Sequence, residues 1–170
     1  ILLIDDNPAI HEDFRKILIP EPLDADLEDS EAKLFGSVAA AVLPTDFEID
    51  SAYQGQEGLA RVDRANQEGR PYALAFVDVR MPPGWDGIET IQRIWEHCPA
   101  LQVVICTAYS DYSWDGIAQK LGRSDNLLIL KKPFDNIEVL QLACALTEKW
   151  NLNRQAMLKL SELEGMVDER

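Results

Sequence analysis

The chain has 170 residues, of which 46% are hydrophobic, enough for one domain with a buried core. Its 30 acidic residues against 16 Lys and Arg give a formal net charge of −14, which argues against non-specific binding to nucleic acids or anionic membranes. Three widely spaced cysteines indicate neither a disulfide framework nor a zinc site, and no apolar run is long enough to span a bilayer, so we expect a protein of the reducing cytoplasm.

Five short runs predict β-strands. Four of them are almost continuously apolar, which is typical of parallel strands covered on both faces. In chain order the runs are ILLI (1–4), FEIDSAY (47–53), ALAFVDV (73–79), LQVVICTA (101–108) and NLLILK (126–131), and the second is the exception.

Segments with helical periodicity separate these strands. The first helix is predicted to begin at Pro8 with Asn7 as its N-cap, and others are predicted over 55–65, 87–98, roughly 111–122 and from about 134 onward. This alternation indicates an α/β fold with a doubly wound, five-stranded parallel sheet. In the flavodoxin-like strand order 2-1-3-4-5, the site lies at the carboxyl ends of the strands, where the first and third strands are neighbours.

Residues 19–46 exceed the usual length of a connection between a helix and a strand. We interpret them as an insertion, which carries seven acidic residues and one Lys. A solvated acidic loop with a short helix starting after Ser30 is favoured, and a surface for docking a partner is the alternative.

Polar side chains follow four of the five predicted strands. Asp5 and Asp6 come after the first, Asp78 ends the third, Thr107 ends the fourth and Lys132 follows the fifth. Buried ionisable groups are costly unless they pair, so we expect these residues to meet. Three carboxylates at one point predict a site for Mg²⁺, which prefers oxygen ligands.

The segments LLIDDNP, FVDVRMPPGWDG, VICTA and LKKPF, in this order, resemble the receiver domain of two-component response regulators. The resemblance covers about 1–150 apart from the insertion. It implies a bacterial phosphorelay switch in which Asp78 accepts a phosphoryl group from a sensor histidine kinase or a phosphotransfer protein. The family marks its own aspartate and is not an enzyme with turnover on a foreign substrate.

The resemblance also implies the metal ligands. Asp6 would bind Mg²⁺ directly and Asp5 largely through water, while Asp78 and the backbone carbonyl of Arg80 would complete the protein ligands. The segment MPPGWDG (81–87) is one residue longer than the family's usual loop, so the geometry next to Asp78 is expected to differ.

Thr107 and Lys132 match the residues that contact the phosphoryl group in this family. Lys131 competes for the second role, but Lys132 directly precedes Pro133, whose peptide bond we expect to be cis. Ile129 stands where many members have a switching aromatic residue. Nearby aromatic residues that could take over this role, or simply pack, are Tyr109, Tyr112 and Trp114.

Two other functions fit part of this pattern. A phosphatase of the haloacid-dehalogenase type also uses Asp, Mg²⁺, Thr and Lys, but its nucleophile lies in a D-x-D motif on the first strand, whereas Asp5 and Asp6 are adjacent. A receiver-like module that binds partners without being phosphorylated is the other alternative. His11 is interpreted as an exposed helix residue, because it lacks the second His of H-E-x-x-H, and His97 as complementing a helix dipole.

The tail, 151–170, is predicted to be a linker or coiled-coil-like helix. Its a/d seam would comprise Asn153, Ala156, Leu160, Leu163 and Val167. A surface helix without a partner is the alternative, since Gly165 interrupts the pattern and two heptads support a dimer only weakly. We expect a weak homodimer through this helix, and an output domain beyond residue 170.

Overall fold

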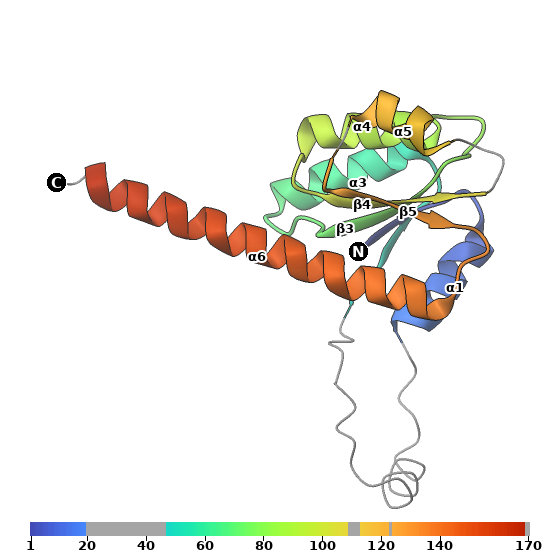
Figure 1. The fold of residues 1–170 in the computed structure, drawn as a ribbon, viewed down its shortest axis with the longest axis horizontal. Helices are drawn as coiled ribbons and strands as arrows, with labels where there is room; N and C mark the ends of the chain where they lie inside the picture. The colour runs from blue at the N-terminus through green and yellow to red at the C-terminus, as the bar shows by residue number, and fades with distance from the viewer. Residues whose placement is uncertain (20–46, 109–112, 123, 169–170) are drawn as a thin grey trace, which may run out of the picture.

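The computed structural model describes residues 1–19, 47–108, 113–122 and 124–168. The short helix predicted to start after Ser30 lies outside the described residues, and so do Tyr109 and Tyr112. Ten helices and strands are arranged within these ranges as a central sheet with helices on both faces (Figure 1).

The five strands form one parallel sheet in the order β2-β1-β3-β4-β5, which confirms the predicted flavodoxin-like topology. Its strands are β1 (Leu2–Ile4), β2 (Asp50–Ala52), β3 (Leu74–Asp78), β4 (Gln102–Thr107) and β5 (Leu127–Lys131). Strand β2 is shorter than the predicted 47–53, because only three of its residues pair with β1.

Helices α1 (Pro8–Leu18) and α6 (Asn136–Asp168) cover one face of the sheet. Helices α3 (Gly55–Gln67), α4 (Gly87–His97) and α5 (Trp114–Leu121) cover the other (Figure 1). The Asn7 side chain accepts a hydrogen bond from the amide of Ala9, which confirms it as the N-cap of α1.

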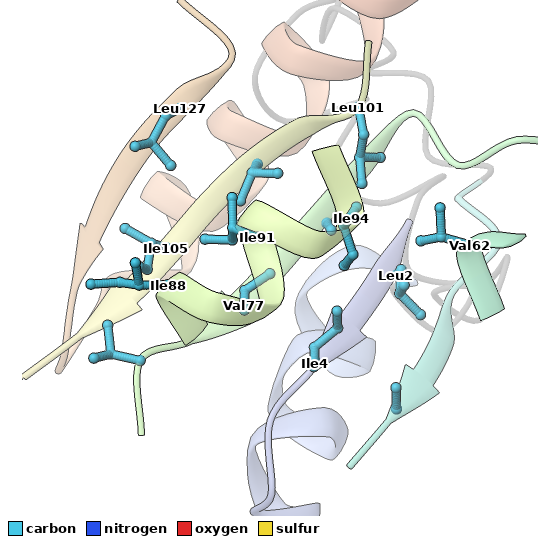
Figure 2. Close-up of a cluster of buried hydrophobic side chains, with 14 of the residues drawn as sticks. Leu2, Ile4, Val62, Val77, Ile88, Ile91, Ile94, Leu101, Ile105 and Leu127 are labelled. Carbon is cyan, nitrogen blue, oxygen red and sulfur yellow. The ribbon is translucent and has the colours of Figure 1, made fainter. Parts of the chain in front are cut away.

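The sheet separates two clusters of buried apolar side chains. On the α4 side, Ile88, Ile91 and Ile94 form the helix stripe that faces the strands (Figure 2). On the other side, Phe14 of α1 packs edge-on against Phe76 of β3 and Phe134, with ring centroids 4.8 and 5.1 Å apart. Both faces are therefore covered, which explains why the strands are continuously apolar.

Helix α6 is docked along only part of its length. Val139, Ala143 and Leu146 are buried against the sheet, whereas every side chain from 151 to 167 is exposed. The second half runs out past the sheet as one continuous helix (Figure 1). Within the described ranges, no helix is both long enough and apolar enough to cross a bilayer.

Candidate functional site

Three strands deliver charged side chains to one point at the carboxyl edge of the sheet. Ile4 of β1 pairs with Val77 of β3, so Asp5 and Asp78 follow on adjacent strands. The Lys132 amine, directly after β5, lies 2.8 Å from Asp78 Oδ1 and 3.1 Å from Asp5 Oδ2. The structure thus brings together three of the residues that the sequence analysis placed at this edge.

Backbone hydrogen bonds hold these residues in place. The amide of Asp5 donates to the Ala52 carbonyl of β2 at 3.1 Å, and Asp5 Oδ1 accepts from the Asn7 amide at 2.8 Å. The Lys132 amide donates to the Thr107 carbonyl at 2.8 Å. The strand ends therefore position the charged groups before any ligand is bound.

Asp6 completes an acidic cluster with Asp5 and Asp78. One carboxylate oxygen from each of the three lies within 4.8 Å of the others. Asp5 is 4% and Asp78 9% exposed, whereas Asp6 is open to solvent. Carboxylate oxygens with access to water are the donor set that Mg²⁺ prefers, so these residues fit a bound magnesium ion.

The cluster shifts the pKa of two groups. The pKa of Asp78 is raised mainly by burial, with a further contribution from Asp5 and Asp6, although Lys132 opposes the shift. Burial acts to lower the pKa of Lys132, but its contacts with Asp78 and Asp5 outweigh burial and raise it. Lys132 is therefore a permanent cation at neutral pH, held between two carboxylates.

Thr107, Lys131 and Arg80 occupy the surroundings of the cluster. Thr107 is 4% exposed, and its hydroxyl donates to the Ala108 carbonyl at 3.0 Å. Lys131 is exposed at the end of β5, whereas the Lys132 amine contacts Asp78, and the role of Lys132 toward a phosphoryl group stays a prediction. Arg80 is exposed after β3, and its carbonyl as a metal ligand stays a prediction.

Gly87 is a site residue to which the sequence analysis gave no role. A Cβ atom there would lie 2.2 Å from the Asp78 carbonyl oxygen, closer than atoms can approach. Its amide donates to the Val79 carbonyl at 2.8 Å, so the start of α4 rests directly on the backbone of the acidic residue. The signal was present in the DG pair of MPPGWDG.

Two peptide bonds next to the site are cis. Lys132–Pro133 confirms the expectation, while Pro82–Pro83 was not foreseen.

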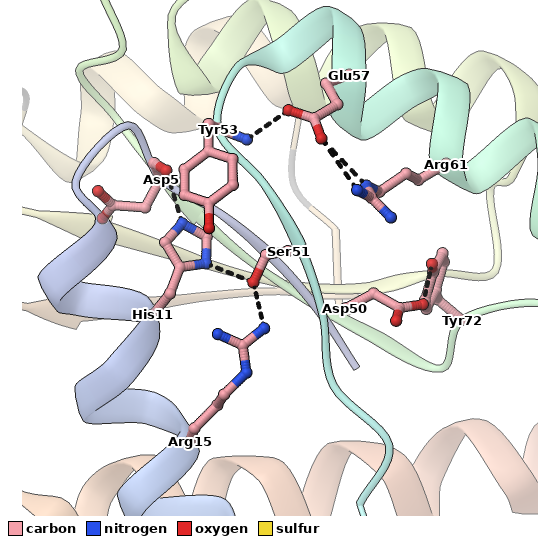
Figure 3. Close-up of polar contacts among 9 residues, drawn as sticks. All are labelled: Asp5, His11, Arg15, Asp50, Ser51, Tyr53, Glu57, Arg61 and Tyr72. Carbon is pink, nitrogen blue, oxygen red and sulfur yellow. Dashed lines mark hydrogen bonds and ion pairs between the residues drawn. The ribbon is translucent and has the colours of Figure 1, made fainter.

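His11 is buried, so the prediction of an exposed helix residue was wrong. It is 1% exposed, and Nε2 lies 2.7 Å from the Asp5 carbonyl oxygen (Figure 3). Nδ1 lies 2.9 Å from Ser51 Oγ, and the ring of Tyr53 lies against the imidazole with the centroids 4.6 Å apart. The polar contacts explain the burial, because both ring nitrogens have partners.

Comparisons with known proteins agree with this architecture. Residues 27–143 match the response regulator receiver domain family; this stretch includes Asp78, Thr107 and Lys132 but not Asp5 and Asp6. The photosynthetic apparatus regulatory protein RegA of Cereibacter sphaeroides is 29% identical over 113 residues, which are 66% of this chain and 56% of RegA. The chain thus spans little more than half the length of that relative.

Two solved structures show the same fold. The receiver domain of NtrX from Brucella abortus has a TM-score of 0.59 at 19% identity, over 86% of this chain and 97% of that one. A CheY-like response regulator receiver domain protein from Methanospirillum hungatei has a TM-score of 0.61 at 20% identity, over 90% of this chain and 96% of that one.

Proposed function

Since the chain belongs to the response regulator receiver domain family of two-component signalling, we propose that it is a phosphorelay switch whose phosphoacceptor is Asp78. The phosphoryl donor is a sensor histidine kinase or a histidine-containing phosphotransfer protein. The phosphorylated state is passed to a partner or to an output domain. The chain acts only on its own aspartate.

The reaction is a displacement at phosphorus. An oxygen of the Asp78 carboxylate forms the new bond, the P–N bond to the donor's imidazole breaks, and the imidazole leaves with the electron pair. The product is an acyl phosphate, which hydrolyses readily and makes the mark reversible. Because such transition states are loose, the task of the protein is to position the groups and neutralise charge.

Lys132 supplies positive charge beside the acceptor. Its amine already lies 2.8 Å from Asp78 Oδ1, so it needs little movement to contact an oxygen of an incoming phosphoryl group. This contact, from a strand distant in sequence, is the observation that carries the proposal. Thr107, on the neighbouring strand β4, would exchange its hydrogen bond to Ala108 for one to the phosphoryl group and so report the phosphorylated state.

Mg²⁺ would be held by Asp5, Asp6, Asp78 and the backbone carbonyl of Arg80. When bound, it supplies the charge that offsets repulsion between the carboxylates and the phosphoryl oxygens. The support for this assignment is the cluster of carboxylate oxygens within 4.8 Å of one another.

The test is labelling with a small phosphodonor. Incubation of the full chain with acetyl phosphate and Mg²⁺ should add one phosphoryl group by intact mass, and Asp78→Asn should take up none. Asp13→Asn, an exposed acid on α1, is the matched control and should label normally. Equal labelling of Asp78→Asn would refute the acceptor assignment, and no labelling of the unaltered chain would leave the non-phosphorylated partner-binding module as the better account.

The exposed half of α6 is the proposed contact for a weak homodimer. Leu160, Leu163 and Val167 of the seam are 55%, 59% and 73% exposed, an apolar stripe that a second copy would cover. We propose that residues 151–170 are a linker to an output domain. Sedimentation of the chain truncated after Trp150, beside the full chain, should show that self-association is lost, and unchanged association would refute this contact.

A further inference from the structure

The contacts of His11 reach the acidic cluster through the backbone of Asp5. His11 lies on the buried face of α1, between the end of β1 and strand β2 (Figure 3). Four groups form a chain of hydrogen bonds: Arg15 contacts Ser51 Oγ at 2.7 Å, Ser51 contacts His11 Nδ1, and His11 Nε2 contacts the Asp5 carbonyl. None of these four hydrogen-bonding groups takes a direct part in the proposed phosphorylation chemistry.

The direction of each hydrogen bond follows from its partners. A carbonyl oxygen only accepts, so His11 Nε2 carries a proton and donates it to Asp5. Arg15 only donates, so the Ser51 oxygen accepts from it, and the Ser51 hydroxyl can donate to an unprotonated Nδ1. The nitrogen that faces Asp5 is therefore protonated, and Ser51 is the partner of the other ring nitrogen.

This donor fixes the peptide group that joins Asp5 to Asp6. The preceding peptide is held by the Asp5 amide, which donates to the Ala52 carbonyl of β2 at 3.1 Å, and the carbonyl of the Asp5–Asp6 peptide accepts from His11 at 2.7 Å. Within the described ranges, no hydrogen bond or ion pair holds the exposed carboxylate of Asp6. The backbone that precedes Asp6 therefore decides which positions this carboxylate can reach.

We propose that His11 is a positioning residue for the acidic pair, which orients the Asp5–Asp6 peptide so that Asp6 points at the metal position. This inference rests on the proposed Mg²⁺-dependent function. Loss of the donor would leave a buried carbonyl unpaired and free the peptide to rotate. When a group that hydrogen-bonds a metal-ligating side chain is mutated, metal affinity typically falls by one to two orders of magnitude. Since His11 acts through one backbone hydrogen bond, a loss of about fivefold to tenfold is expected.

Two substitutions separate the hydrogen bond from the packing. In His11→Gln the side-chain amide nitrogen stands as many bonds from Cβ as Nε2 does, so it can still donate to Asp5. In His11→Asn the amide reaches only the position of Nδ1, so it can contact Ser51 but not Asp5. Both variants are smaller than His and polar, which makes them matched controls for each other.

The first measurement is a Mg²⁺ titration of the full chain, followed by the amide resonance of Asp6 in ¹H–¹⁵N spectra. His11→Asn should bind Mg²⁺ about fivefold to tenfold more weakly, and His11→Gln within about twofold of the unaltered chain. Unchanged affinity in His11→Asn, or an equal loss in both variants, would overturn the proposal.

The second measurement needs no metal. Long-range ¹H–¹⁵N spectra of the unaltered chain should show the Nε2-protonated tautomer, and Asn but not Gln at position 11 should displace the ¹⁵N resonance of Asp6. Protonation at Nδ1 instead would overturn the proposal. If the unaltered chain binds no Mg²⁺ while these metal-free results hold, the proposed function fails and the positioning of the peptide stands.

Discussion

Replacing Asp6 with Asn should stabilise the metal-free protein. Asp6 belongs to a cluster of three carboxylates, but the Lys132 amine contacts Asp5 and Asp78 and not Asp6. The substitution therefore removes repulsion without breaking an ion pair to any residue that the structure describes, and because Asp6 is exposed it creates no cavity.

The size of the effect follows from the separation of the charges. At the outer limit of 4.8 Å between ligand oxygens, two unit charges repel by about 0.9 kcal/mol in a water-like dielectric and about 3.5 kcal/mol at an effective dielectric of 20. The exposure of Asp6 favours the lower value, and attraction to Lys132 offsets one of its two repulsions. The expected gain is about 1 kcal/mol in the free energy of unfolding, or about 2–4 °C in Tm.

Magnesium should reverse the order. At a free concentration of ten times Kd, Mg²⁺ would stabilise the unaltered chain by about 1.4 kcal/mol, whereas Asp6→Asn lacks a ligand and gains less. Thermal and urea unfolding with EDTA and with Mg²⁺ would measure both effects. Asp13→Asn removes the same charge outside the cluster and is the control. An equal gain in both variants, or a gain for Asp6→Asn that persists in saturating Mg²⁺, would refute the reasoning.

Three further outcomes are expected. Gly87→Ala should lower the free energy of unfolding in urea by about 1–3 kcal/mol or more, because the new Cβ would meet the Asp78 carbonyl oxygen. Gly165→Ala is the control: no atoms lie within 4 Å of its Cβ, so it should gain up to about 1 kcal/mol of helix stability. Without metal, Asp78→Asn should be more stable than the unaltered chain at neutral pH. The pKa of Asp78 in the folded protein is raised above the ordinary value of 3.8. The stability that Asp78 contributes is therefore fully present below pH 3.8 and is lost as the pH rises through the folded-state pKa. The advantage of Asn over Asp should accordingly vanish on acidification. Lys132→Ala should slow labelling by acetyl phosphate by at least tenfold and Lys131→Ala should not, and the opposite ranking in a labelling time course would assign the site to Lys131.

The fold could be predicted from the sequence because its main signals are local. Continuous apolar strands require cover on both faces, and their alternation with helices leaves few topologies, so the strand order and the meeting of Asp5, Asp78 and Lys132 followed. Close backbone contacts carry no such periodic signal. The approach of Gly87 to the Asp78 carbonyl depends on how the loop of residues 81–87 returns the chain to the end of β3.

The spacing of His11 along α1 indicates the buried face, but it does not reveal the partners that a polar residue needs there. His11 precedes Phe14 by three residues and Leu18 by seven, and all three are buried on one face of α1. The prediction failed because a polar residue on that face needs partners, and these come from β2, which lies about 40 residues further along the chain. Tertiary pairing of this kind is not visible in a single helix.

The most direct test of the account is to trap the phosphorylated residue chemically. Borohydride reduces an aspartyl phosphate to homoserine, so peptide mapping after treatment with acetyl phosphate and Mg²⁺ locates the acceptor. The account predicts homoserine at position 78, and none when Mg²⁺ is replaced by EDTA. Homoserine at another position, or none at all in the presence of Mg²⁺, would contradict it.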